Sequence, residues 1–217
     1  MVEIVVLALL AGFIALRLIA VLGRHDESSE PAQPMMRRAD AASEGSNVVP
    51  LVQAERPPLS LPDNLNDTAR GGLEEIAEAD PYFDPPAFIE GAQAAYRMVL
   101  EAFWSGDKDA LKELVSDDIY DDFSAAIDAR SADEMSYDNR LVSIHDVEIL
   151  GAERRGHMAE VTVRFDAELI TVTRDANGAV IDGSEDEAAQ THDVWTFSRH
   201  LGSDDPAWLL IETDGAD

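Results

Sequence analysis

The sequence predicts an α+β domain in which helices come first and a curved antiparallel sheet follows. Two observations lead to this fold class. Between residues 85 and 127, apolar residues recur at three- and four-residue spacing, which is typical of amphipathic helices. From about residue 141 onward, apolar and polar residues alternate, which is typical of half-buried strands. Three helices followed by about four strands, with one bent sheet wrapped around a long helix, make an α+β arrangement.

The helical part contains one long helix and two shorter ones. Pro85-Pro86 marks the start of the long helix, and its end is expected at Ser105-Gly106, because glycine readily takes the left-handed conformation that terminates helices. Asp107 is expected to cap the second helix and Ser116 the third.

Strands are expected over residues 141–153, 157–173, 192–200 and 207–213. In the second of these, one face is wholly apolar, and after Leu169 the apolar positions shift by one residue, which indicates a bulge or sharp bend. Asn177-Gly178 is a strong hairpin signal. The apolar face comprises Ala159, Val161, Val163, Phe165, Ala167 and Leu169.

Composition excludes several classes of function. The chain has 217 residues and a formal net charge of −28, so polyphosphate would repel it and nucleic-acid binding is not expected. From residue 80 onward, 10 basic and 32 acidic residues give −22, so most of the charge lies on the folded part. Cysteine is absent, which excludes disulfides, thiolate nucleophiles and cysteine-ligated metals and fits a reducing compartment.

Residues 1–23 are expected to form a transmembrane anchor. The apolar stretch 2–22 is long enough to cross the hydrocarbon core and would contact membrane lipid. A cleaved signal peptide is the rival interpretation, but Glu3 and the absence of an early Lys or Arg argue against it. Basic residues follow the stretch, so the positive-inside rule places the N-terminus outside and the C-terminal domain in the cytoplasm. An uncleaved signal that anchors a periplasmic domain is the alternative topology.

Residues 24–79 are expected to be a disordered linker, because they contain six of the ten prolines and no aromatic residue. A short helix near 67–79, capped by Asp67 or Thr68 and weakened by Gly71-Gly72, is expected to dock on the domain or to stay loose. The α+β domain is then residues 80–217.

The domain resembles the Tim44-like domain family, which includes the C-terminal domain of the mitochondrial import-motor adaptor and bacterial TimA-type proteins. The most specific part is Trp195-Thr196-Phe197-Ser198-Arg199 followed by Pro206-Ala207-Trp208-Leu209-Leu210. Asp80-Pro81-Tyr82-Phe83, Gly91-Ala92, Glu101-Ala102-Phe103 and Gly106-Asp107 agree in the helical half.

The resemblance implies a cone-shaped fold like that of nuclear transport factor two, and a non-catalytic adaptor at an inner membrane. With the anchor, this places the protein in a bacterial inner membrane. In the mitochondrial branch a long N-terminal region recruits the Hsp70 motor, whereas here only an anchor and a tether are expected before the domain, so the family's translocase and chaperone partners are not carried over.

No catalytic, cofactor or metal site is expected. The apolar face of the long strand carries no ionisable group, and His145 and His192 would each need a partner from another strand. The five histidines are therefore interpreted as surface or structural residues, with a catalytic dyad as the less favoured alternative. The aspartates at 117, 118, 121 and 122 lack the spacing of a calcium loop. They are interpreted as a solvated helix face, with docking of a basic partner as the alternative.

A pocket for an acyl chain or an apolar peptide, if the fold encloses one, is expected to be lined by aromatic residues and one arginine. Trp195, Phe197 and Arg199 share a strand face, so a cation at 199 should meet a carboxylate or a ligand headgroup. The aromatic residues are otherwise interpreted as core. The predicted set comprises Tyr96, Phe103, Phe123, Trp195, Phe197, Arg199 and Trp208.

The function that these observations predict is a membrane-anchored adaptor or scaffold without catalytic activity. It would present a protein- or lipid-binding domain at the cytoplasmic face of the inner membrane, in protein translocation or membrane-protein assembly. The alternative is a small-ligand binder or an isomerase- or dehydratase-type enzyme, because cone folds also host such sites.

Overall fold

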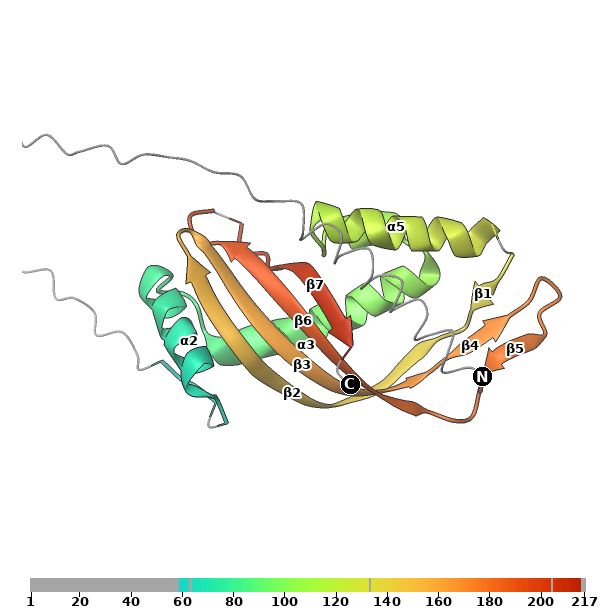
Figure 1. Cartoon of the computed structure of the whole chain (residues 1–217), viewed down its shortest axis with the longest axis horizontal. Helices are drawn as coiled ribbons and strands as arrows, with labels where there is room; N and C mark the ends of the chain where they lie inside the picture. Colours follow the sequence, from blue (N-terminus) through green and yellow to red (C-terminus); the bar gives the residue numbers. More distant parts are fainter. Residues whose placement is uncertain (1–58, 63, 133, 204, 216–217) are drawn as a thin grey trace, which may run out of the picture. The chain divides into compact units, whose positions relative to one another are not determined.

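The computed structural model describes residues 59–62, 64–132, 134–203 and 205–215 (Figure 1). The predicted membrane anchor and most of the predicted linker lie outside these residues. Within the described part, helices precede strands, as the sequence predicts. The helices are α2 (Asp67–Ala79), α3 (Pro85–Ser105), α4 (Lys108–Lys112) and α5 (Asp117–Ala132). The strands are β1 (Ser136–Tyr137), β2 (Arg140–Arg155), β3 (Met158–Ile170), β4 (Val172–Arg174), β5 (Val180–Gly183), β6 (Ala189–His200) and β7 (Leu209–Gly215).

Helix α2 forms over the predicted range and packs against β2. Its N-cap is Asn66, not Asp67 or Thr68: the Asn66 side chain accepts from the Ala69 amide at 2.8 Å and donates to the Leu150 carbonyl at 2.9 Å. One side chain therefore caps the helix and ties its start to the sheet. Leu73 and Ile76 are fully buried, so the helix is docked and not loose.

The long helix α3 begins and ends where the sequence predicts. Asp84 caps it ahead of Pro85, and Gly106 terminates it in the left-handed conformation with φ 77°. Its buried stripe faces the sheet. That stripe comprises Phe88, Ala92, Tyr96, Val99 and Ala102.

Helices α4 and α5 also follow the predicted caps. The Asp107 carboxylate accepts from the Ala110 amide at 3.0 Å, and the Ser116 hydroxyl accepts from the Ile119 amide at 3.5 Å. Between the two helices, Val115 forms a parallel bridge to Leu210 of β7. The helical part is thereby joined to the last strand of the sheet.

The main sheet has four antiparallel strands in the order β2-β3-β6-β7. Three register irregularities interrupt the pairing of β2 with β3, and such bulges bend a strand and increase its twist. The sheet curves as a result, with α3 along one face (Figure 1). The prediction of an α+β fold with a curved four-stranded antiparallel sheet is therefore confirmed.

The slip after Leu169 marks a change of sheet. Strand β3 ends at Ile170, and β4 begins at Val172 in a second sheet of order β1-β4-β5 that the sequence did not predict as a separate sheet. The predicted Asn177-Gly178 hairpin joins β4 to β5, with Gly178 at φ 81°. The chain thus leaves the main sheet for a short hairpin and returns to it at β6.

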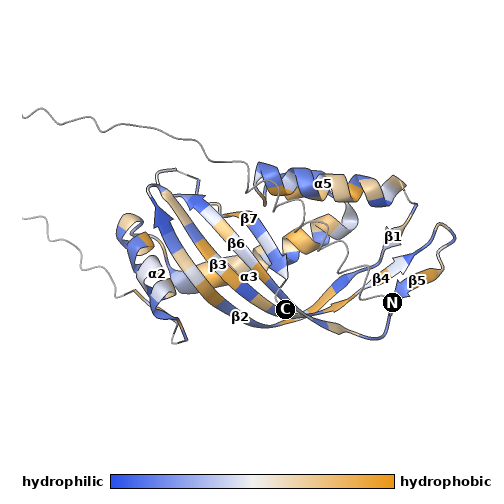
Figure 2. Cartoon of the chain, viewed as in Figure 1, coloured by the Kyte–Doolittle hydropathy of each residue, from blue (hydrophilic) through white to orange (hydrophobic). Residues whose placement is uncertain are grey.

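The core lies between α3 and the apolar face of β3. Figure 2 shows apolar and polar residues alternating along the main sheet. Four residues of the predicted β3 face are fully buried, and each large side chain removed from water in this way contributes about 1.5–3 kcal/mol. They are Ala159, Val161, Val163 and Phe165, whereas Leu169 is only partly buried. Among the residues that the structure describes, no helix combines the length and the apolar character needed to cross a membrane.

Candidate functional site

The C-terminal end of β6 forms an ion pair with the segment that joins α2 to α3. Arg199 Nη1 donates to Asp80 Oδ2 at 2.9 Å, and the side chains are only 17% and 7% exposed. The carboxylate expected opposite Arg199 is therefore Asp80, which lies 119 residues earlier in the chain. Burial of both charges makes this contact much less sensitive to salt than a surface ion pair.

Asp80 also shapes the turn that follows it. Its Oδ1 accepts from the Tyr82 amide at 3.0 Å, and its carbonyl accepts from the Phe83 amide at 3.0 Å. The turn directs Tyr82 outward, where the side chain is 94% exposed, and Phe83 inward, where it is 7% exposed. The buried Asp80 thus holds Arg199 of β6 by an ion pair and sets the opposite orientations of Tyr82 and Phe83.

Four aromatic rings pack next to this ion pair. Phe88 lies 4.8 Å from Trp208 and 6.1 Å from Phe197 between ring centroids, and Phe83 lies 5.9 Å from Trp208. Such tilted and edge-on contacts are favourable beyond the area that they bury. The rings come from the turn before α3, from α3 itself, from β6 and from the start of β7, so they hold these elements together.

Over these rings lies a cavity of about 390 Å³, which we call the aromatic groove. Its wall along α3 is made by small residues, and its mouth carries exposed apolar side chains such as Met98. The principal lining residues are Phe88, Ala92, Ala95, Phe197, Arg199 and Trp208. An apolar cavity with few polar groups is the usual form of a binding site.

The guanidinium of Arg199, which lines the groove, has one N–H group without a hydrogen-bond partner among the described residues. Its Nε is buried and has no hydrogen-bond partner among the described residues, although Nη1 is paired with Asp80. A buried donor without an acceptor costs free energy, on the order of 1–3 kcal/mol. Arg199 as a whole lines the groove and its side chain is 17% exposed, so the groove combines an apolar surface with one guanidinium.

The seven predicted site residues divide into three places. Phe197, Arg199 and Trp208 come together at the aromatic groove. Tyr96 and Trp195 lie in the core, where Tyr96 stacks on Phe165 at 4.5 Å. That any of the seven residues binds a partner stays a prediction. The sequence analysis named Asp80 and Phe83 only as members of a run that resembles the family and not as site residues. That run, Asp80-Pro81-Tyr82-Phe83, was the signal that could have identified these two residues.

Phe103 and Phe123 form a separate contact at the end of α3. Their ring centroids are 5.0 Å apart, and the Arg130 guanidinium lies 5.2 Å from the Phe103 ring. Arg130 Nη2 also donates to the Phe103 carbonyl at 2.6 Å and to the Trp104 carbonyl at 3.0 Å. A cation on the last carbonyls of a helix stabilises its C-terminus, so this cluster has a structural role. Burial lowers the pKa of Arg130.

A partly buried acid that the sequence did not reveal lies at the other end of β6. Tyr96 donates its hydroxyl hydrogen to Asp193 Oδ2 at 2.6 Å, and Thr191 donates to the same oxygen at 3.1 Å. Burial raises the pKa of Asp193 against the opposing effect of these two hydrogen bonds. Burial, followed by the Asp193 charge, raises the pKa of Tyr96. Strand alternation places Asp193 on the face opposite His192, but only the tertiary contact with α3 shows that it is desolvated.

The outer face of the main sheet pairs two histidines with carboxylates of β3. His192 Nδ1 lies 2.7 Å from Asp166 Oδ1, and His145 Nε2 lies 3.2 Å from Glu168 Oε2. Each histidine finds its partner on another strand, as the alternation requires. Both imidazoles are about half exposed beside a shallow cavity of about 300 Å³. Within the described part of the chain, no three His, Asp or Glu residues are grouped to hold a metal ion.

Ser143 approaches one of these pairs without forming a catalytic triad. Its Oγ lies 3.3 Å from His145 Nε2 and 3.4 Å from Glu168 Oε2. In a Ser-His-acid triad the serine and the carboxylate bind opposite nitrogens of the ring, so that the acid orients the base. Here both contact Nε2, and the serine hydroxyl is not activated in that way.

Comparison with known proteins agrees with the resemblance seen in the sequence. The family model described as the Tim44-like domain matches residues 69–215. Mitochondrial import inner membrane translocase subunit TIM44 of Rattus norvegicus is 27% identical over 181 residues, which cover 78% of this chain and 39% of the relative. TIM44-1 of Arabidopsis thaliana is 27% identical over 145 residues, which cover 64% of this chain and 31% of the relative. Human TIM44 is 27% identical over 143 residues, which cover 64% and 32%.

This chain thus spans only about a third of the length of the curated relatives that it matches. Among solved structures, the intermembrane space region of chloroplast protein ARC6 shares 14% identity, covers 58% of this chain and 95% of that chain, and gives a TM-score of 0.38, which is too low to support an argument. The family model, by contrast, covers more than half of the chain and extends from the first turn of α2 to the end of β7. The chain therefore belongs to the Tim44-like domain family.

Proposed function

We propose that the protein is a membrane-anchored adaptor that binds a protein partner in the aromatic groove. The observation that carries the proposal is the groove itself: an apolar cavity whose wall contains the guanidinium-bearing side chain of Arg199, which is 17% exposed. An apolar side chain of a partner would displace water from the rings, and a main-chain or side-chain oxygen would accept from Arg199. Both interactions are typical of protein interfaces with an aromatic anchor.

The membrane part of the proposal rests on the sequence. Residues 2–22 are the proposed anchor, with the N-terminus outside and the domain on the cytoplasmic side of a bacterial inner membrane. The segment between residue 24 and the packed helix α2 is the proposed tether. Tethering raises the concentration of the domain near membrane partners without any new contact. The strongly negative domain is held near an anionic surface and repelled by it, which leaves its faces free for proteins.

The relatives support a role in protein transport. Those named above are subunits of a mitochondrial import inner membrane translocase. We extend to this chain the general role of a non-catalytic subunit at an inner membrane, in translocation or membrane-protein assembly. We also propose that the curved sheet around α3 is a cone fold of the nuclear-transport-factor-two type.

The alternative function is a small-ligand binder or an isomerase-type enzyme. The observation that favours it is the Tyr96–Asp193 pair, because a desolvated acid next to a tyrosine is a common acid–base arrangement. Neither residue lines the aromatic groove or the shallow outer cavity, so a substrate in either would not reach the pair. This separation favours the adaptor.

The test fills the groove without disturbing the ion pair. Ala95 lines the groove and is half-buried, so Ala95→Phe should occupy the cavity while Asp80 and Arg199 stay paired. Tagged full-length protein is purified from native membranes after mild crosslinking, and proteins recovered in near-stoichiometric amounts are identified. We expect such a partner with the wild type and its loss with Ala95→Phe, while Gly91→Ala at the exposed edge of the groove retains it.

A second measurement separates the two functions. The full-length protein in detergent is screened by thermal shift against a library of small metabolites. A metabolite that raises the melting temperature strongly, and whose effect is abolished by Asp193→Asn, would contradict the adaptor and support the enzyme.

A further inference from the structure

Strand β5 is the free edge of the small sheet. The order β1-β4-β5 leaves one side of β5 without a partner among the described residues, and Figure 1 shows the β4–β5 hairpin extending away from the main sheet. An unpaired edge presents a row of main-chain donors and acceptors. Many proteins blunt such an edge with lysine or proline, but β5 reads Val180-Ile181-Asp182-Gly183 and contains neither.

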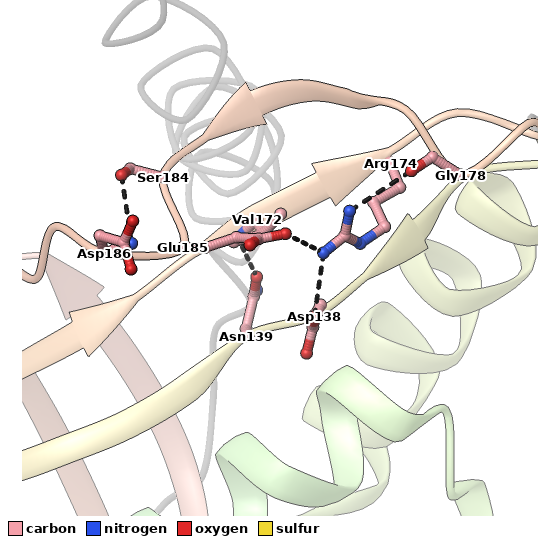
Figure 3. Close-up of polar contacts among 8 residues, drawn as sticks. All are labelled: Asp138, Asn139, Val172, Arg174, Gly178, Ser184, Glu185 and Asp186. Carbon is pink, nitrogen blue, oxygen red and sulfur yellow. Dashed lines mark hydrogen bonds and ion pairs between the residues drawn. The ribbon is translucent and has the colours of Figure 1, made fainter.

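The hairpin is held in a fixed shape by Arg174. Its guanidinium donates to Asp138 at 3.4 Å, to the Gly178 carbonyl at 3.3 Å and to Glu185 (Figure 3). Three segments, the end of β1, the turn and the loop after β5, therefore meet at one side chain. Gly183, with φ 82°, lies so close to the Thr171 carbonyl that a Cβ there would be 1.9 Å from its oxygen. The edge is preorganised and would lose little entropy on binding.

Exposed apolar side chains lie on this edge. Val180 is 44% exposed and Ile181 is 55% exposed, and they are two of the few large apolar residues in the described part that face solvent. Figure 2 shows this apolar segment of β5 next to polar residues of the hairpin. A strand that pairs with β5 would cover both side chains and satisfy the open main-chain groups at the same time.

The charge around the edge is almost entirely negative. Glu185, Asp186 and Glu187 follow β5 directly, and Arg174 is already paired with Glu185 and Asp138. Within β5, Asp182 Oδ1 is buried and has no hydrogen-bond partner among the described residues. A second copy of the chain would bring the same negative charges together, and the formal charge of −28 opposes that association. A basic partner is favoured by the same charges.

We propose that β5 binds an extended, basic segment of another protein, which adds to the small sheet as a fourth strand. Val180 and Ile181 face opposite sides of the small sheet. Apolar side chains at alternate positions of that segment would pack on Ile181, and its lysines or arginines would lie against the acidic loop 185–187. This surface is separate from the aromatic groove, because the two share no residue. It would give the adaptor a second contact, and its test is independent of the test of the groove.

The experiment uses the full-length protein in detergent micelles and a fluorescent peptide of four Lys-Val repeats. Binding is followed by fluorescence anisotropy, and amide hydrogen exchange is measured with and without the peptide. We expect saturable binding that weakens with added salt and slows exchange of amides in residues 180–183. A Glu-Val peptide of the same length should not bind, and a Lys-Val peptide N-methylated at every residue should bind weakly, because neither of its edges can donate hydrogen bonds to the ladder.

The variant Asp186→Lys/Glu187→Lys removes charge without touching the Arg174 contacts. Its matched control, Asp121→Lys/Asp122→Lys, makes the same change on the exposed face of α5. We expect the first variant to lower the affinity for the Lys-Val peptide about 3- to 20-fold, because two exposed charge pairs are lost, and the control to lower it less than about 2-fold. Ile181→Ser should also weaken binding of the peptide, through loss of the apolar contact and without a change of charge.

Four results would overturn the proposal: no binding at millimolar peptide, equal weakening by the control pair, equal binding of the N-methylated peptide, or protection outside β5 only. A concentration-dependent dimer that Ile181→Ser disrupts would show that the edge pairs with a second copy, and this too would overturn it. None of these results bears on the aromatic groove, whose test is the Ala95→Phe variant.

Discussion

Removal of the Arg199 charge should destabilise the domain much more than removal of the whole ion pair. Arg199→Ala leaves Asp80, which is 6% exposed, as a buried carboxylate without its cation. Losing one partner of a buried pair costs about 3–5 kcal/mol, whereas replacing both by groups of similar volume is often close to neutral. For a domain of this size, about 3–5 kcal/mol corresponds to a fall in melting temperature of roughly 6–20 °C.

A double-mutant cycle measures the interaction directly. The full-length protein, Arg199→Met, Asp80→Asn and the double variant are unfolded with urea and followed by tryptophan fluorescence, since Trp208 lines the same groove as Arg199. We expect the double variant to be more stable than Arg199→Met alone by at least about 1 kcal/mol. The difference should change little between low and high salt, because the pair is buried. A loss under about 1 kcal/mol in Arg199→Met, or a double variant equal to the sum of the singles, would refute the reasoning.

Three further predictions concern the packing of α2, the partly buried Asp193 and the hairpin. Gly72 lies so close to the Ala152 carbonyl that a Cβ would be 1.9 Å from its oxygen, whereas a Cβ at Gly71 would meet nothing within 4 Å. In urea unfolding, Gly72→Ala should therefore destabilise the domain by about 1–3 kcal/mol, and Gly71→Ala should stabilise it by about 0.5–1 kcal/mol. Burial raises the pKa of Asp193 in the folded state, so the stability that this residue contributes is complete below the ordinary aspartate pKa and is lost as the pH rises through the folded value. When the free energy of unfolding is measured from pH 4.5 to 8, the stability of Asp193→Asn relative to the wild type should therefore increase with rising pH. Two parallel curves would contradict this. Asp193→Ala should lose about 1–3 kcal/mol at all these pH values, because the Tyr96 hydroxyl keeps no acceptor there. Gly183→Ala should accelerate amide exchange in residues 174–184 without changing exchange in β3, because the clash with Thr171 is local to the hairpin.

The elements that could be predicted are those set by local physics. Pro85 and Gly106 delimit α3 because one residue presets the helical backbone and the other can leave it. The alternation along β3 predicts its buried face through Ala167, because a strand presents successive side chains to opposite sides. The hairpin at Asn177-Gly178 follows from turn chemistry. Each of these depends on neighbours in the sequence.

The features that could not be predicted depend on contacts far apart in the chain. The Asp80 partner of Arg199 is 119 residues away, and no spacing rule connects the two. The docking of α2 depends on the approach of Gly72 to β2, where a sequence rule sees only a weakened helix. The second sheet formed because β4 changes partners after a one-residue slip, which the sequence marked as a bend without indicating the new pairing. Tyr96 and Phe103 were grouped with the groove residues because all are aromatic, but their positions along α3 place them in separate clusters.

Site-specific photocrosslinking tests the central claim, a protein partner in the aromatic groove, most directly. A photoreactive amino acid replaces Met98, which is 46% exposed at the groove, or Val142, which is 47% exposed on β2 away from it. The full-length protein is irradiated in native membranes. The account predicts one discrete protein adduct from position 98 that is lost in the Ala95→Phe background and absent from position 142. Identical adducts from both positions, or an adduct at 98 that survives Ala95→Phe, would contradict it.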